Sequence, residues 1–188
     1  MTNRQKQYVK WDENNLYLAL EVTDDIHYME ASDVYNSWGA DSLQISFDPL
    51  RMAGYGANDN HIRFIASYNA GTDTSSLGVE SWGPIQGAAL SDIRYKFTRD
   101  EANKKTIYEI AFPWKTILTT DRLPAKANLT DLGISVLVND NDANGREGWI
   151  KYMDGIATGK DPSQFGDLIL TDADSLVSLR VVKMPAGW

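Results

Sequence analysis

The stretch LYLALEV, residues 16–22, places a large apolar side chain at every second position. Successive side chains of an extended chain point to opposite faces, so one face here carries Leu16, Leu18, Leu20 and Val22. A period of two is typical of a β-strand that is buried on one face only. The stretch therefore predicts a half-buried strand.

The same alternation recurs along the chain. In DSLQISFDP, residues 41–49, the side chains of Leu43, Ile45 and Phe47 fall on one face. Six further strand candidates begin at His61, Asp92, Thr106, Gly133, Gly148 and Gly166. Turn-forming clusters separate them, namely GYGANDN (54–60), NAGTDTSS (69–76), WGPIQG (82–87), DEANKK (100–105) and NDANG (141–145). Eight short strands at this spacing predict an all-β fold, an antiparallel β-sandwich of jelly-roll or immunoglobulin-like architecture with two sheets.

Helix is scarce in this reading. PWKTILTT, residues 113–120, favours one turn, because proline is tolerated at a first helical position. We expect at most one or two short helical turns. Residues 1–171 are predicted to form the sandwich, and residues 172–188 an appended strand or tail.

The composition excludes several classes of function. The 188 residues carry a formal net charge of -8, whereas sequence-independent binding to nucleic acid or to an anionic membrane needs a basic face. No apolar run is long enough to span a bilayer, so membrane insertion is not expected. The absence of cysteine excludes disulfides and thiolate metal sites but leaves metals with oxygen ligands open.

Five blocks in order carry a resemblance to a known family: VKWDENNLYLALEVTDD, WGADSLQISFDP, YEIAFPWKTI, LGISVLVNDND and KDPSQFGDLIL. Together they resemble family 9 carbohydrate-binding modules and the broader group of DOMON-like sandwiches, over about residues 8–171. The resemblance implies a non-catalytic sandwich that binds a polysaccharide or oligosaccharide and holds structural calcium. It also implies an extracellular or cell-surface location and a place in a larger, multidomain, glycan-active protein.

Trp38 is the leading candidate for sugar contact. It lies in NSWGAD among small and polar residues, and an exposed indole can stack on the apolar face of a pyranose ring. In the family a Trp at this place forms one wall of the sugar slot, and a polar acceptor and an Arg accompany it. Gln44 and Arg63 match those two positions, with Gln44 in place of the usual Glu. Ordinary packing of Trp38, and solvation of Gln44 and Arg63, are the alternatives.

The second wall of the slot is missing. Family members that bind the ends of sugar chains have a further Trp and an Asn before the final block, but Gly159 and Lys160 stand there in this chain. The replacement wall is expected from one of three aromatic residues, Trp82, Trp149 or Tyr152. A one-sided platform favours an internal stretch of polysaccharide over a chain end.

Six aspartates are candidate calcium ligands: Asp24, Asp25, Asp41, Asp140, Asp142 and Asp161. The stretch from Asp140 begins like an EF-hand loop, but its twelfth position is Lys151 and its flanks are predicted strands, so that interpretation fails. It is better read as a hairpin connection in which Asn144 and Gly145 take positive φ angles. The closeness of the other aspartates is implied by the resemblance alone; capping of local turns is the alternative.

Two other functions stay open at this point. Some members of the sandwich group hold haem between Met and His, and here Met29 lies near His27. A structural or protein-interaction domain with a decayed sugar site is the other alternative. An enzyme is not expected, because the two histidines are far apart in the sequence and no nucleophile motif accompanies them.

Overall fold

The computed structural model describes residues 4–31, 33–51, 61–119, 130–157 and 159–170. Within them the strands are β1 (Arg4–Trp11), β2 (Asn15–Thr23), β3 (Ser42–Asp48), β4 (Ile62–Asn69), β5 (Thr74–Ser81), β6 (Arg94–Asp100), β7 (Lys105–Pro113), β8 (Thr130–Asp140), β9 (Gly148–Tyr152) and β10 (Gly166–Leu170). The short 3-10 turns are η1 (Val34–Gly39), η2 (Leu90–Asp92), η3 (Trp114–Thr116) and η5 (Pro162–Gln164).

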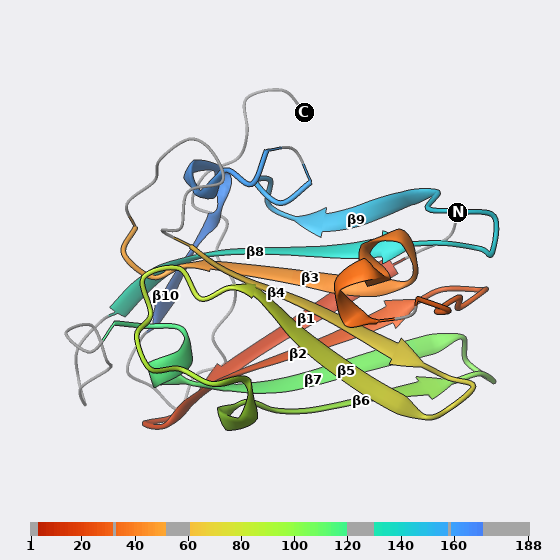
Figure 1. Ribbon diagram of the computed structural model, residues 1–188, viewed down its shortest axis with the longest axis horizontal. Helices are drawn as coiled ribbons and strands as arrows, with labels where there is room; N and C mark the ends of the chain where they lie inside the picture. The colour runs from red at the N-terminus through yellow and green to blue at the C-terminus, as the bar shows by residue number, and fades with distance from the viewer. Residues whose placement is uncertain (1–3, 32, 52–60, 120–129, 158, 171–188) are drawn as a thin grey trace.

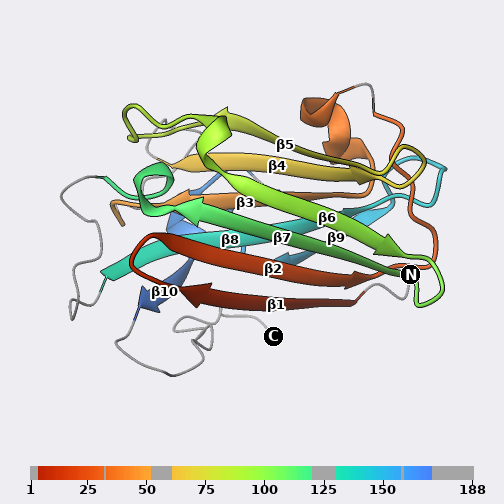
Figure 2. The same ribbon diagram turned by 90° about the horizontal axis from the view of Figure 1, so that it is seen from below.

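The strands form two stacked sheets (Figures 1 and 2). A four-stranded sheet has the order β1-β2-β7-β6, and a six-stranded sheet has the order β10-β8-β3-β4-β5, with β9 also paired to β8. Every pairing in these sheets is antiparallel. The predicted all-β antiparallel sandwich is therefore confirmed.

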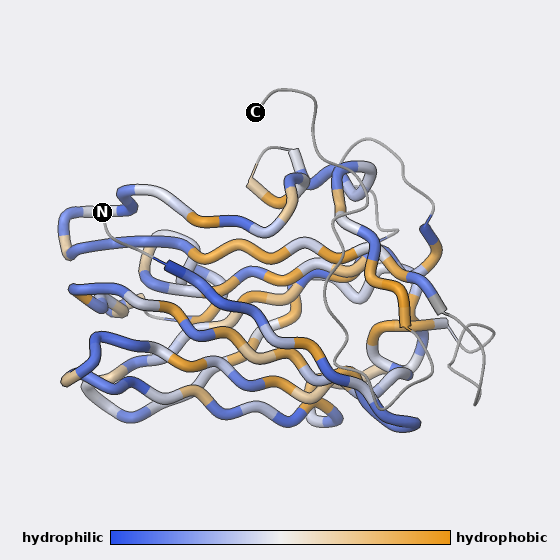
Figure 3. The backbone as a smooth tube through the Cα atoms, turned by 180° about the vertical axis from the view of Figure 1, so that it is seen from behind, coloured by the Kyte–Doolittle hydropathy of each residue, from blue (hydrophilic) through white to orange (hydrophobic). Residues whose placement is uncertain are grey.

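The core lies between the two sheets and follows the predicted alternation. Leu16, Leu18 and Leu20 are each at most 1% exposed. Phe112 on β7 packs against Phe47 and Phe64 of the other sheet, with ring centroids 5.2 Å and 5.0 Å apart. Figure 3 shows apolar positions alternating with polar ones along the strands, while hydrophilic residues gather at hairpin ends. Burial of this aromatic cluster joins the sheets.

Two strands were not predicted. In β1 the only buried residue is Val9, because β1 pairs with β2 alone and presents Arg4, Lys6, Tyr8 and Lys10 to solvent. In β5 the segment Thr74–Ser76, part of the predicted turn at residues 69–76, pairs with β4. These small polar residues adopt an extended conformation because their backbones form hydrogen bonds with β4, and not because of the propensity of their side chains.

The edges of the sheets differ in how they are covered. Beside β6, the Ser75 hydroxyl accepts a hydrogen bond from the Phe97 backbone N–H at 2.9 Å and donates to its carbonyl at 3.3 Å. This one side chain on β5 occupies backbone groups of β6, so the two sheets are linked along that side of the sandwich.

The turns needed two corrections. The described residues contain four 3-10 turns, more than the one or two expected; η3 is the predicted one, with Pro113 before it and not inside it. In the β8–β9 hairpin the positive φ angles belong to Ala143 and Gly145, not to Asn144. The predicted segments 54–60 and 172–188 lie outside the described residues. Among those that are described, no helix is long and apolar enough to cross a membrane.

Candidate functional site

The turn η1 lies on the outer face of the six-stranded sheet (Figure 1). Asp33 caps it by accepting hydrogen bonds from the backbone N–H groups of Tyr35 and Asn36, at 2.8 Å and 3.1 Å. At Gly78 on β5 an added Cβ would lie 2.7 Å from Val34 and 3.0 Å from Tyr35. The missing side chain at Gly78 therefore lets η1 pack directly on the sheet.

Two aromatic side chains of η1 are exposed. Tyr35 and Trp38 are each 51% exposed. Residues three apart in a 3-10 helix eclipse each other, so both rings project from the same side of η1. The exposure of Trp38 agrees with the expectation that it is not a core residue. Tyr35 was not predicted as a site residue. Its spacing of three residues from Trp38 places the two rings on one side only if the segment forms a 3-10 helix, which the sequence did not reveal.

Trp149 lies at the same end of this face. It is 44% exposed on β9, directly across from Asn139 on β8, and the Arg146 guanidinium lies 4.6 Å from its ring centre. The Asn139 amide in turn donates to the Ser42 hydroxyl at 2.9 Å, close to where η1 joins β3. Of the three replacement aromatics, Trp149 therefore shares the face and the end of the sheet with Trp38.

Gln44 and Arg63 also face outward from the six-stranded sheet. Gln44 pairs with Ile65 and Arg63 pairs with Ser46, which makes Gln44 and Arg63 diagonal neighbours, about 7–8 Å apart. Both are partly exposed. An Arg63 Nη lies 3.4 Å from His61 Nε2, whereas its buried Nε has no hydrogen-bond partner among the described residues. The structure thus brings the two predicted polar residues together below η1.

Lys160 occupies the place where the resemblance led us to look for a second wall. Its Nζ lies 3.2 Å from Glu80 Oε2 at the far end of β5, and its backbone has a φ of 51°. Gly159 before it has a φ of 91°. At the position of the expected second wall the structure therefore has a partly exposed ion pair.

Trp82 and Tyr152 do not join this face. Trp82 packs against the core, with its ring edge-on to Phe64 at 5.8 Å. Tyr152 lies across from Val136 on the core side of the sheet and also packs against the core. Strand alternation explains the difference within β9, since Trp149 and Lys151 point outward and Tyr152 inward. The prediction that either residue walls a sugar slot is not supported by its position.

Acidic side chains gather at one end of the sandwich. Asp24 follows β2, Asp41 precedes β3 and Asp140 ends β8; all three are at most 5% exposed. Pairing of Ser42 with Asn139 brings Asp41 beside the β8–β9 hairpin, where the Asn141 N–H donates to Asp41 Oδ1 at 3.0 Å. The cluster therefore joins the end of β2 in one sheet to β3 and β8 in the other.

Burial dominates the electrostatics of this cluster. The pKa of Asp41 is raised to about 8, chiefly by burial and in smaller part by the nearby carboxylates of Asp24 and Asp140. Burial likewise raises the pKa of Asp24 to about 6, against the opposing effect of the Arg99 guanidinium, whose nearest nitrogen lies 3.9 Å away. One arginine does not compensate several buried carboxylates, so the site favours an additional cation.

The donor set fits a cation that prefers oxygen. Asp24, Asp25 and Asp142 offer carboxylate oxygens that all lie within 4.8 Å of one another. Two ligands at Ca²⁺ distances of about 2.6 Å can be at most about 5 Å apart, so these oxygens can share one ion. Asp142 Oδ1 is buried and has no hydrogen-bond partner among the described residues. Such an oxygen is costly unless a cation or water meets it.

His27 borders the cluster but does not fit haem. Its side chain is 2% exposed, Nε2 lies 2.8 Å from the Tyr68 carbonyl and Nδ1 lies 3.7 Å from Asp41. Nε2 is engaged by that carbonyl, and Nδ1 lies with the carboxylates of Asp24 and Asp41, close enough to share a small cation with them. The position of His27 therefore gives the haem alternative no support.

Asp161 is not part of the cluster. It caps η5, where its carboxylate accepts hydrogen bonds from the Ser163 N–H at 3.0 Å and the Gln164 amide at 2.7 Å. These hydrogen bonds lower its pKa, the Ser163 side chain first among them. Phe165, next to η5, packs against Gly133 near the start of β8, about 23 Å along that strand from Asp140. Asp161 thus caps a local turn, as the alternative expected, and lies apart from the other predicted metal ligands.

Exposed aromatic rings beside planar polar side chains, on one face of a two-layer β-sandwich, are the kind of surface on which a protein can bind sugar rings. The sequence matches the family described as "Carbohydrate family 9 binding domain-like" over residues 4–173, so the chain belongs to this family. The predicted resemblance is confirmed: the protein is a carbohydrate-binding module.

Two curated relatives are xylanases. The chain is 32% identical to endo-1,4-beta-xylanase A of Thermotoga neapolitana and 30% identical to endo-1,4-beta-xylanase A of Thermotoga maritima, each over 168 residues. The match covers 88% of this chain but only 14% of either relative. It thus spans about one seventh of these longer proteins.

Two solved structures share the fold. They are a family 9 carbohydrate-binding module from Caldicellulosiruptor kristjanssonii in complex with cellotriose and one in complex with glucose, with TM-scores of 0.68 and 0.70. Both are 18% identical to this chain; they cover 89% and 93% of it, and the chain covers 74% and 81% of them. At this identity the likeness establishes the sandwich fold.

Proposed function

We propose that this module binds an internal stretch of a β-linked glucan or xylan on the outer face of the six-stranded sheet. The observation that carries the proposal is the pair of exposed rings on η1, Tyr35 and Trp38, above the polar side chains of Gln44 and Arg63. The xylanase relatives and the cellotriose complex of the Caldicellulosiruptor module support this choice of ligand.

Binding would divide between stacking and hydrogen bonds. The rings of Tyr35, Trp38 and Trp149 would cover the apolar faces of successive sugars, because such stacking removes apolar surface from water. Gln44 can both donate to and accept from a hydroxyl, and the guanidinium of Arg63 can donate to two neighbouring hydroxyls. This division gives affinity to the rings and selectivity to the polar pair.

The Lys160–Glu80 ion pair favours an internal stretch over a chain end. It replaces the second aromatic wall with two charged side chains that are each about one third exposed or less. A chain end held between two rings gains contacts on both faces, whereas a platform with one aromatic side accepts a chain that continues in both directions. We therefore propose recognition of chain interiors.

Calcium is proposed as a structural ligand of the acidic cluster. Asp24, Asp25 and Asp142 would hold it, with Asp41 and Asp140 adding negative charge from close by. The ion would neutralise buried carboxylates and link the ends of the two sheets. None of its three proposed ligands is a residue that we assign to sugar contact.

We also propose that the module is non-catalytic and acts as an accessory domain of a larger extracellular protein. Family membership and the small share of the xylanases that it matches support this role. A bound module would keep its parent protein at the polysaccharide surface and raise the local substrate concentration.

Affinity electrophoresis through gels that contain glucan, xylan or mannan tests the sugar proposal. We expect retardation by one of the β-linked polymers, loss of retardation in Trp38→Ala, and no change in the control variant Ile169→Ala, which shortens an exposed apolar side chain on β10, outside both the aromatic face and the groove of the other sheet. Equal retardation of wild type and Trp38→Ala would contradict the assignment of the face. Absence of retardation by every polymer would favour the structural or protein-interaction alternative.

A further inference from the structure

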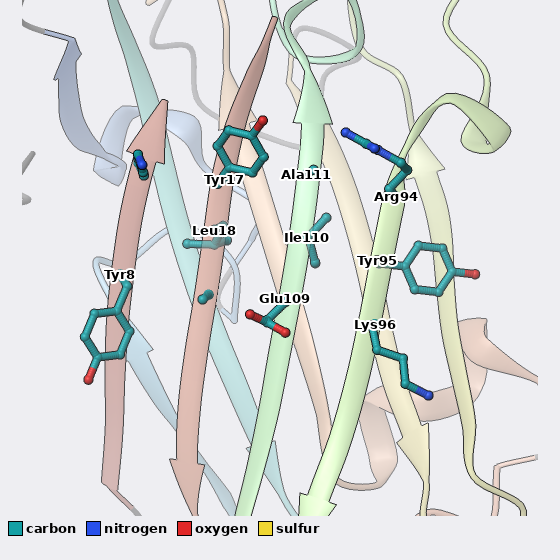
Figure 4. Close-up of a pocket in the computed structure, with 11 residues that line it drawn as sticks. Tyr8, Tyr17, Leu18, Arg94, Tyr95, Lys96, Glu109, Ile110 and Ala111 are labelled. Atoms are coloured by element: carbon teal, nitrogen blue, oxygen red, sulfur yellow. The ribbon is translucent and has the colours of Figure 1, made fainter. Parts of the chain in front are cut away.

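A concave surface lies on the outer face of the four-stranded sheet, and Figure 4 shows residues that line it. It is an open groove of about 490 Å³. All four strands contribute to it, from Tyr8 on β1 to Lys96 on β6. Strands lie about 4.8 Å apart, so the groove crosses roughly 14 Å of sheet, enough for a short oligosaccharide.

Strand pairing explains the groove. One row of adjacent residues runs Tyr8, Ala19, Glu109 and Lys96 across the sheet. The next row runs Lys10, Tyr17, Ala111 and Arg94. Each row has an alanine on an inner strand and longer side chains around it. The short alanine side chains therefore form the bottom of the groove, and the longer tyrosine, lysine and arginine side chains form its sides.

The two tyrosines provide apolar surface in different ways. Tyr8 is 54% exposed on the edge strand β1. Tyr17 is held in place, because its hydroxyl donates to Asp12 Oδ2 at 2.7 Å. A ring fixed in this way loses little conformational entropy when a ligand covers it, which favours stacking with a sugar.

The charge of the groove is opposite to that of the chain. Three cations, Lys10, Arg94 and Lys96, line it together with one anion, Glu109, whereas the whole chain has a net charge of -8. Lys96 lies 3.7 Å from Asp73. Lys10 and Arg94 form no ion pair within the part of the chain that the structure describes. Their charges are therefore available to a ligand.

We propose that this groove is a second glycan-binding site, specific for a segment that carries carboxylates, such as a run of uronic acid residues. The tyrosines and the alanine floor fit the flat faces of sugar rings. The cationic side chains of Lys10 and Arg94 can bind the carboxylates of the sugar. Glu109 lies in the same row of residues as Tyr8, and its carboxylate can accept hydrogen bonds from sugar hydroxyls.

The two glycan sites would act independently. The groove lies on the outer face of the four-stranded sheet, and Trp38 projects from η1 on the six-stranded sheet. These two sheets are the opposite layers of the sandwich (Figure 2). A neutral and an acidic polysaccharide can then be bound on opposite faces at the same time. The module would crosslink two polymers of a mixed wall material.

The test measures affinity for polygalacturonate in the Trp38→Ala background, where the first site is removed. Its matched probe is fully methyl-esterified pectin, which keeps the sugar backbone without the charge. We expect binding to polygalacturonate that weakens as salt is raised, and much weaker binding to the ester. Removing the charges in Lys10→Gln/Arg94→Gln should weaken polygalacturonate binding by about fivefold or more, and Tyr8→Ala should also weaken it.

The control variant Lys104→Gln/Lys115→Gln removes the same charge from two exposed lysines outside the groove and should bind as the parent does. Equal losses in both double variants, or equal binding of sodium poly-L-glutamate, would show attraction to any polyanion and overturn the proposal. Equal binding of the methyl ester would remove the role of the carboxylates. Failure of the Trp38 site with this groove intact would overturn the proposed function alone, so the two outcomes are distinguishable.

Discussion

Trp38 and Trp82 are both tryptophans near a strand end, but they stand in opposite environments. Trp38 projects from η1 and is 51% exposed, whereas Trp82 packs edge-on against the buried Phe64. The local sequence of each is similar, a Trp followed by Gly. The two residues differ in the side of the six-stranded sheet on which they lie: Trp38 lies on the outer face and Trp82 packs on the core side.

Exchanging these two tryptophans for alanine should give opposite results. Trp38→Ala should abolish binding to the β-linked polymer and change the free energy of unfolding by less than about 0.5 kcal/mol. Trp82→Ala should leave binding intact and cost about 2–3 kcal/mol, because it opens space beside the core. Urea unfolding and affinity electrophoresis of both variants check this; a large stability loss in Trp38→Ala would mean that its ring is a packing residue.

Asp33 sets the geometry of the aromatic pair. It caps η1, and its Oδ2 also accepts from the Asn36 amide at 2.8 Å. Asp33→Ala should cost about 1 kcal/mol in unfolding free energy and weaken sugar binding, because the first turn of η1 loses its cap. Asp33→Asn keeps an acceptor and should stay close to wild type in both measurements. Full affinity in Asp33→Ala would show that η1 is held by its packing on the sheet alone.

At the level of elements, η1 depends on the absence of a side chain in β5. Gly78→Ala should displace Val34 and Tyr35, since the new Cβ would lie within 3.0 Å of both. We expect weaker sugar binding with a loss of about 1 kcal/mol or more in stability. Gly71→Ala in the β4–β5 hairpin meets only the Asn69 side chain and serves as the control. Isothermal titration with the bound polymer's oligosaccharide would measure both variants, and identical affinities would contradict this packing role.

Elements with an apolar face were predictable from the sequence, and those without one were not. β2 and β3 were found because burial imposes a period of two on Leu16–Val22 and on Leu43–Phe47. β1 and β5 carry little apolar pattern, and their extended conformation comes from pairing with β2 and β4. A strand that is stabilised mainly by pairing with its neighbours has little apolar alternation in its sequence, so it is hard to predict from that sequence.

The candidate site was predictable to a similar extent. Trp38, Gln44 and Arg63 were placed on one face through the resemblance, and the structure agrees. The role of Tyr35 depends on the orientation of η1, and the choice of Trp149 over Tyr152 depends on which side chains of β9 point outward. The local sequence does not determine either orientation. The position of Asp161 apart from the acidic cluster was not predictable, because an aspartate that caps a turn and one that binds a cation occur in similar sequences.

For the whole molecule, the acidic cluster is a link between sheets. Asp24 comes from the four-stranded sheet, while Asp41 and Asp140 come from the six-stranded sheet. Calcium bound by these loops should raise the melting temperature, with EDTA reversing the effect, because a ligand of the folded state alone stabilises it. Asp142→Asn should reduce the calcium-dependent shift. The same substitution at Asp161 should leave that shift unchanged, and an equal reduction there would contradict the location of the site.

The two edge strands of the four-stranded sheet, β6 and β1, are protected from pairing with other chains by different means. On one side the Ser75 hydroxyl occupies backbone groups of β6. On the other, β1 presents Arg4, Lys6 and Lys10 along its outer face. Positive charges at a sheet edge repel an identical edge, so neither side invites the strand-by-strand growth of fibrils. A domain crowded at high density on an insoluble polymer would thereby remain a dispersed set of single molecules, free to detach and rebind.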